Sequence, residues 1–245
     1  GKILFDLYAQ TGDERYKIAM DTLRKQMAEQ PRTSEGGFWH KLRYPHQMWL
    51  DGIFMASPYL VQYGATFNEP ALFDEATKQI LLINSKTYDP ATGLFYHGWD
   101  ESREQKWSNP ETGCSPNFWS RSIGWYGAAI VDVLDFLPQE TAGRDSIIQI
   151  LQGLAKAIVK YQDPSSGTWY QVTDQGAREG NYLESSATAL FIYTLAKAIN
   201  KGYIGNEYIE PTQKAFDGMV KTFTRLEEDG SYTITNCCAV AGLGG

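Results

Sequence analysis

A loop signature recurs along this chain between segments with helical hydrophobic periodicity. It reads SEGGFW from Ser34, DPATGLFY from Asp89, DPSSGTWY from Asp163 and EDGSYT from Glu228. Its glycines, at positions 37, 93, 167 and 230, are 56, 74 and 63 residues apart, and each interval has room for two helices and their connections. Asp-Pro ends a helix, glycine adopts a positive φ, and the alternating aromatic residues begin a short extended arm. The pattern predicts a tandem array of helical hairpins.

Apolar residues recur at helical spacing over most of the chain, and strand signals are short. Asn68, ahead of Glu69-Pro70, and Ser115, ahead of Pro116, are the expected N-caps of two helices. We expect helices at about Asp13 to Glu29, Gln47 to Tyr63, Pro70 to Lys86, Asn117 to Leu137, Arg144 to Tyr161, Leu183 to Asn200 and Glu207 to Thr224.

The helices that follow the loops differ from those that precede them. The segments QMWLDGIFMASPYL, NFWSRSIGWYGAAIVDVL and YLESSATALFIYTL are apolar nearly all round, whereas the segment from Arg144 to Tyr161 has one polar face. A helix that is apolar all round is buried on both sides, as in an inner ring of helices enclosed by an outer ring. We therefore predict an all-α toroid of helical hairpins that occupies residues 1–245 as one domain.

Composition excludes several function classes. The net charge of -7 argues against nucleic acid as a partner, because phosphate binding needs a clustered basic excess. No run of 18 apolar residues exists to span a membrane. The three cysteines have no CxxC spacing and the three histidines no HExxH spacing, so we expect neither a metal site nor a disulfide framework. The abundance of Trp and Tyr suits stacking on sugar rings.

The run GLFYHGWDES places Asp100 directly after Trp99 and close to His97. A carboxyl held against aromatic faces loses hydration, which disfavours its charged form, so that it can serve as a proton donor near neutral pH. The alternative is a turn in which Asp100 only accepts hydrogen bonds from its own backbone.

Each apolar helix carries one charged residue near its start: Asp51, Arg121 and Glu184. Equivalent placement in successive units puts all three at one mouth of the ring. Since burying an unpaired charge is costly, these residues either form ion pairs with Arg121 or face a wet cavity. In the second case Arg121 offers a planar fork to a ligand carboxylate, in a pocket whose walls are Trp49, Trp119 and Trp125.

The runs QMWLDGIFMA, GLFYHGWDES, NFWSRSIGWYG, DPSSGTWYQV, GNYLESSA and VAGLGG together resemble the unsaturated rhamnogalacturonyl hydrolases of glycoside hydrolase family 105, which are related to the unsaturated glucuronyl hydrolases. The resemblance covers nearly the whole chain, in order. It implies an (α/α)6 toroid, of which four hairpins are an incomplete part. We therefore expect further segments before residue 1 and after VAGLGG, in a bacterial protein of the cytoplasm or periplasm.

The resemblance also implies an activity. The family removes the 4,5-unsaturated galacturonate that a pectin lyase leaves at the non-reducing end of rhamnogalacturonan oligosaccharides, and it uses no metal or other cofactor. The expected partner is therefore an unsaturated oligosaccharide. Carried over by motif, Asp100 is the general acid and base and Asp51 the second essential carboxylate. The expected substrate-binding residues are His40, Trp49, His97, Trp99, Trp119, Arg121, Trp125, Trp169 and Glu184.

The substrate of that family is a vinyl ether, so one carboxyl group suffices for its hydration, whereas ordinary glycosidases need two around the anomeric bond. We expect Asp51 to lie within reach of Asp100, where its negative charge keeps Asp100 protonated. Two alternatives stay open at this point: a non-catalytic toroid that binds uronic acids, and an unsaturated glucuronyl hydrolase that acts on glycosaminoglycan fragments. The presence of both carboxylates favours an enzyme, because they would repel an anionic sugar.

Overall fold

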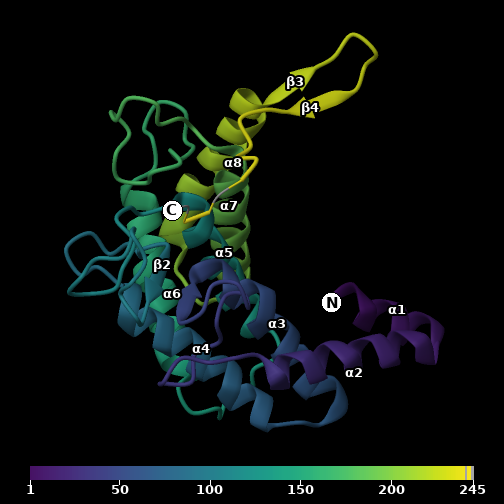
Figure 1. Ribbon diagram of the computed structural model, residues 1–245. Coiled ribbons are helices and arrows are strands. Elements are labelled where there is room, and N and C mark those ends of the chain that lie inside the picture. The colour runs from purple at the N-terminus through teal and green to yellow at the C-terminus, as the bar shows by residue number, and fades with distance from the viewer. Residues whose placement is uncertain (241, 244–245) are drawn as a thin grey trace.

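A computed structural model describes residues 1–240 and 242–243, so the closing VAGLGG run lies partly outside the described residues. The described part is mostly helical, with two short ribbons (Figure 1). Its helices are α1 (Ile3–Thr11), α2 (Glu14–Glu29), α3 (Leu50–Phe67), α4 (Ala71–Thr87), α5 (Ser120–Val133), α6 (Arg144–Lys160), α7 (Ser185–Asn200), the 3-10 helix η1 (Asn206–Tyr208) and α8 (Ile209–Phe223). The antiparallel pairs are β1 (Gln47–Trp49) with β2 (Gly98–Asp100) and β3 (Thr224–Leu226) with β4 (Tyr232–Ile234).

The predicted alternation of buried and half-buried helices is confirmed. The helix α5 packs between α3 and α7, and α4 packs against both α3 and α6. Twelve of the 14 residues of α5 are buried, against six of 17 in α6. An all-round apolar helix therefore lies inside, and an amphipathic helix lies outside with its polar face in water.

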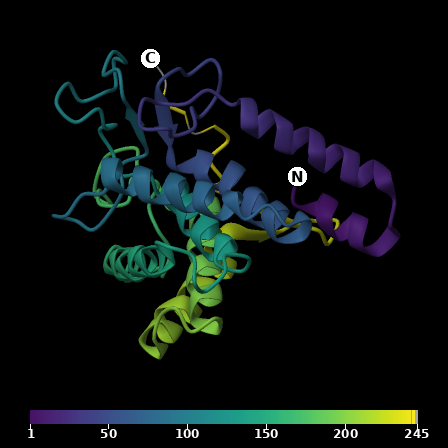
Figure 2. The ribbon, with the colours of Figure 1, turned by 90° about the horizontal axis from the view of Figure 1, so that it is seen from below.

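The first two helices form a hairpin of their own, set to one side of the other helices (Figures 1 and 2). They pack on α3 and α4 through a second, smaller core of Phe5, Met20, Tyr59, Leu60, Tyr63 and Leu72. At the other end of the chain, β3 and β4 project as a hairpin beyond α8 (Figure 1). Three pairs of outer and inner helices are thus present in the described residues, together with α8 as a fourth outer helix.

The recurring loop has the same geometry in two of its predicted copies. The Gly93 N–H donates to the Asp89 carbonyl at 2.8 Å with φ +79°, and the Gly167 N–H donates to the Asp163 carbonyl at 2.8 Å with φ +76°. In the first copy the positive φ falls on Gly36, one residue before the predicted glycine.

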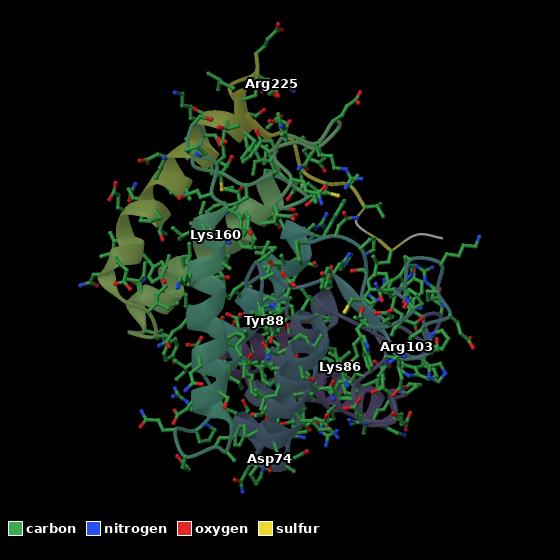
Figure 3. The ribbon with its side chains drawn as sticks, turned by 90° about the vertical axis from the view of Figure 1, so that its left-hand side faces the viewer. Asp74, Lys86, Tyr88, Arg103, Lys160 and Arg225 are labelled. Atoms are coloured by element: carbon green, nitrogen blue, oxygen red, sulfur yellow. The ribbon has the colours of Figure 1, made fainter. Side chains whose placement is uncertain are left out.

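One further copy of this loop was not predicted. In Asn109-Pro-Glu-Thr-Gly113 the Gly113 N–H donates to the Asn109 carbonyl at 2.8 Å, and Gly113 has φ +78°. The side-chain oxygen of Asn109 accepts hydrogen bonds from the N–H groups of Glu111 and Thr112, as in an Asx turn. Its spacing matches Asp-Pro-x-Thr-Gly, so a pattern that admits Asn for Asp finds it in the sequence. This loop closes the segment 101–114, whose Arg103 lies at the edge of the molecule (Figure 3).

Each inner helix begins with the same junction. The first residue of the helix donates its N–H to a backbone carbonyl on the loop of the next unit, so the three helix starts lie at one end of the array. The pairs are Leu50 with His97 at 3.0 Å, Ser120 with Gln171 at 2.9 Å and Ser185 with Asn236 at 3.1 Å.

Some predicted boundaries were wrong. Residues 47–49 form β1 rather than the first turn of α3, because they pair with β2. Asn68 ends α3 in the left-handed conformation, with its N–H bonded to the Gly64 carbonyl, instead of capping α4. Ser115 precedes α5 by five residues and accepts a hydrogen bond from the Gly98 N–H at 3.2 Å. These polar residues serve the loops rather than the helix starts.

In the part of the chain that the structure describes, no helix is long and apolar enough to cross a membrane. The same residues contain no group of three His, Cys, Asp or Glu side chains that could hold a metal ion.

Candidate active site

The β1–β2 ribbon carries Asp100 at the mouth of the inner helices. Gln47 pairs with Asp100, and Met48 pairs with Trp99. Directly opposite residues point to the same face of a ribbon, and successive residues alternate. Gln47 and Asp100 therefore share one face, while Met48 and Trp99 share the other, which packs into the main hydrophobic core.

Gly98 lies on the same face as Asp100, where the ribbon is closely covered. A Cβ at this position would lie 2.9 Å from Cδ1 of Trp49 and 2.8 Å from Cδ1 of Leu243. Only glycine fits there. The last described residues thus pass over the face of the ribbon that carries Asp100.

The carboxylate of Asp100 is fully buried and is held by its own loop. It accepts hydrogen bonds from the Ser102 N–H at 3.0 Å, the Ser102 hydroxyl at 2.7 Å and the Gln105 N–H at 3.0 Å. The sequence suggested that Trp99 desolvates this carboxyl, but Trp99 points to the opposite face of the ribbon. The geometry is that of the predicted alternative, an Asp that accepts bonds from its own turn, in a buried setting. The role of Asp100 as proton donor stays a prediction.

Asp51 is the second residue of α3 and contacts an imidazole. Its Oδ2 lies 3.1 Å from Nε2 of His97, although the ring N–H is not aligned with the oxygen as a hydrogen bond requires. Burial raises the pKa of Asp51, but the neighbouring His97 and the more distant His40 outweigh it, so the pKa lies below its ordinary value. Asp51 is therefore a carboxylate at neutral pH.

Four rings connect the start of α3 to the start of α5. His40 stacks on Trp49 with centroids 4.3 Å apart and planes 9° apart. His97 meets the edge of Trp49 at 5.2 Å and lies parallel to Trp119 at 6.4 Å. Burial lowers the pKa of His40 to about 4, so this ring is neutral at pH 7. Nδ1 of His40 and Nε1 of Trp119 are buried without a hydrogen-bond partner.

Arg121 and Glu184 do not form the ion pairs considered from the sequence. The ion pairs among the described residues include neither side chain. The Arg121 guanidinium donates to the carbonyl of Cys238, and the N–H of Cys238 donates to Glu184 at 2.8 Å. Glu184 also caps α7 by accepting from the N–H groups of Ser186 and Ala187. Glu184 is thus held at the start of α7, whereas Arg121 donates to backbone through one of its nitrogens and keeps further donors.

The tryptophans separate into two groups. Trp169 has no exposed surface, donates its indole N–H to the Ile158 carbonyl at 2.8 Å and meets Phe191 edge-on. Trp169 and Trp99 both lie in the core, so the structure does not expose either ring to a substrate, contrary to the prediction of the sequence analysis. Trp119 and Trp125 keep partial exposure and remain candidate pocket walls.

Sequence reasoning missed two buried amides. Gln47 lies opposite Asp100 and accepts the indole N–H of Trp49 at 3.0 Å. Gln171 is buried with neither amide atom bonded. Gln171 lies four residues after Gly167, just as His97 lies four residues after Gly93. This equivalent position in the repeat could have identified Gln171 from the sequence.

The whole chain, residues 1–245, matches the model of Glycosyl Hydrolase Family 88. The chain therefore belongs to this family and is classed as a glycosidase, and the resemblance noted from the sequence is confirmed. It is 36% identical to Protein Atu3128 of Agrobacterium fabrum over 195 residues, which are 78% of this chain and 82% of that protein.

Two further similarities bear on the fold and its completeness. The chain is 26% identical to the unsaturated rhamnogalacturonyl hydrolase YesR of Bacillus subtilis over 236 residues, or 94% of this chain and 63% of that protein. A solved family 105 glycoside hydrolase of C. acetobutylicum superposes with a TM-score of 0.97 at 43% identity, over all of this chain and 68% of that one. The chain thus spans about two thirds of each, and the predicted toroid architecture is confirmed.

Proposed function

We propose that this protein hydrates the double bond of a 4,5-unsaturated galacturonate at the non-reducing end of rhamnogalacturonan oligosaccharides and thereby releases that sugar. The observation that carries the proposal is the setting of Asp51: it begins α3 directly after β1, with its Oδ2 3.1 Å from Nε2 of His97, while Asp100 ends the partner strand β2 at the other end of the ribbon, opposite Gln47. The similarity to YesR supports the galacturonate as substrate over the glucuronate of glycosaminoglycan fragments.

The proposed reaction begins with proton transfer. Asp100 in its acid form delivers a proton to C4 of the vinyl ether, and the positive charge is shared by C5 and the ring oxygen. Water then adds at C5, and Asp100, now ionised, takes the proton of that water. The hemiketal collapses, the ring opens and the neighbouring sugar leaves from C1. Asp51 stays ionised throughout and stabilises the positive charge that develops.

The remaining residues bind the sugar. Trp119, partly exposed and with a free indole N–H, suits stacking and hydrogen bonding at once. Arg121 lies one helical position beyond the start of α5, and its guanidinium is the proposed partner of the uronate carboxylate. Nδ1 of His40 offers a further polar contact.

The test is to incubate the protein with an unsaturated galacturonyl-rhamnose disaccharide and to follow the loss of ultraviolet absorbance from the conjugated double bond. The saturated disaccharide is the control, since it has no vinyl ether and must not react. An unsaturated glucuronyl-hexosamine disaccharide is tested in parallel. Faster turnover of the glucuronyl substrate would overturn the galacturonate assignment, and turnover of neither would overturn the proposed function.

A further inference from the structure

His97 is buried too deeply to be a substrate ligand. Only 3% of its surface is exposed. The edge of Trp49 covers one side of the ring, Trp119 lies parallel to it, and Nε2 lies 3.1 Å from Oδ2 of Asp51. A side chain fixed by three neighbours holds its rotamer and can fix the group it contacts.

The backbone of His97 acts on the same helix. Its carbonyl accepts the N–H of Leu50, the first residue of α3, at 3.0 Å, while its imidazole reaches the second residue, Asp51. Backbone and side chain together fix both the start of α3 and the direction of the carboxylate. The N-cap residue of α3, Trp49, makes no side-chain hydrogen bond to the helix start.

The fold does not require this imidazole. The two later junctions use the same backbone bond but carry Gln171 and Asn236 at the position of His97, and their helices have no carboxylate as second residue. A histidine facing an aspartate is found only at the junction next to Asp100, among those that the structure describes. This difference points to chemistry rather than to construction of the ring.

We infer that His97 is a positioning residue that holds the Asp51 carboxylate in a fixed direction at the start of α3, and that it does not itself bind the sugar. The inference rests on the proposed function for its kinetic consequence. The titratable groups that act on Asp51 are His97 and His40, and Lys41 and Asp51 in turn act on His40.

The kinetic test compares His97→Ala with His97→Gln, whose amide N–H can replace Nε2 as a donor. For His97→Ala we expect kcat to fall roughly 10- to 100-fold, as for other groups that orient a reacting ligand, with KM within about twofold. We expect His97→Gln to recover part of kcat. His46→Asn is the matched control, because His46 is exposed and Asn tolerates its positive φ of 61°.

A second measurement does not depend on turnover. The carboxyl carbon of Asp51, labelled with 13C and assigned by its loss in Asp51→Asn, is titrated by NMR in the parent and in His97→Ala. We expect the Asp51 pKa to rise in His97→Ala, because the variant loses a contact that favours the charged form, and the acid limb of the kcat profile to move up with it.

Three outcomes would overturn the inference: an unchanged titration of Asp51, a raised KM with unchanged kcat, or an equal loss in His97→Ala and His46→Asn. If the parent protein turns over no unsaturated uronide, the proposed function fails, but the titration of Asp51 still decides the role of His97.

Discussion

Two carboxylates stand at the starts of inner helices, and their surroundings differ. Glu184 caps α7 and accepts hydrogen bonds from the backbone N–H groups of Ser186, Ala187 and Cys238. Asp51 caps nothing, and its contact is the imidazole of His97. The first carboxylate is fully occupied by the fold. The second is held by a titratable side chain and retains acceptor capacity.

We interpret this difference as that between a structural charge, Glu184, and the proposed functional charge, Asp51. An N-cap stabilises a helix by about 1 kcal/mol, which is reason enough for a carboxylate at the start of α7. The half-buried carboxylate of Asp51 has no aligned donor, which costs stability, so its presence in α3 calls for another reason. A charged residue at the start of an apolar helix therefore has a different role in α3 than in α7.

The largest effect is expected at Asp100. Asp100→Asn keeps an oxygen acceptor for the turn of Ser102 and Gln105, so the fold should persist, while turnover should fall roughly 10²- to 10⁴-fold because the proton donor is lost. Steady-state kinetics on the unsaturated disaccharide and a thermal melt check both statements. Turnover near the parental rate would remove Asp100 from the mechanism.

The next prediction concerns the difference between Trp169 in the core and Trp119 at the candidate site. Trp169→Ala should cost about 3–5 kcal/mol of unfolding free energy, because it empties a fully buried site and removes the indole hydrogen bond to the Ile158 carbonyl. Trp119→Ala should mainly raise KM. Denaturant unfolding and kinetics of both variants test this assignment, and the reverse result would return Trp169 to the substrate site.

Substitution of each carboxylate tests the proposed difference between Asp51 and Glu184. Asp51→Asn should lower kcat roughly 100-fold, since it removes the charge that faces the reaction. Glu184→Gln should instead lower the unfolding free energy by about 1 kcal/mol, with a smaller effect on kcat, because it weakens the cap of α7. A larger loss of turnover in Glu184→Gln than in Asp51→Asn would contradict the distinction.

The last effect is a pH dependence of stability at His40. Its folded pKa of about 4 lies below the ordinary value of 6.5, so the unfolded chain binds a proton in that window and the folded chain does not. The unfolding free energy should therefore decrease as the pH falls from about 6.5 to 4, by about 2 kcal/mol after allowance for the partial exposure of the ring. Urea unfolding at several pH values should show a flatter curve for His40→Asn.

The sequence analysis succeeded where a pattern is local and repeated. The inner helices α3, α5 and α7 were predicted because a helix that is apolar all round must be buried on all sides. The Asp-Pro-x-x-Gly loops were predicted because the residues that determine the turn lie within five positions of one another. The strand β1 was missed because its three residues adopt extended structure only by pairing with β2, about fifty residues later.

The site was harder to predict because its contacts are distant in sequence. Arg121 and Glu184 looked available for each other, but both bond the backbone of Cys238, 117 and 54 residues away. Aromatic alternation after a loop glycine does not say which ring faces the core, so Trp99 and Trp169 were assigned to the substrate. Asp51 and His97 were both named as site residues, but their pairing depends on the junction at Leu50 that only the fold creates.

The proposed reaction begins with protonation of a vinyl ether, and one isotope experiment tests this step directly. The protein is incubated with the unsaturated galacturonyl disaccharide in D₂O, and the released uronate is examined by NMR and mass spectrometry at early times. If Asp100 delivers a solvent-derived proton, the product carries one deuterium at C4. Release of the sugar with the double bond intact and no deuterium at C4 would contradict the account, because the bond would then have been cleaved at the anomeric carbon.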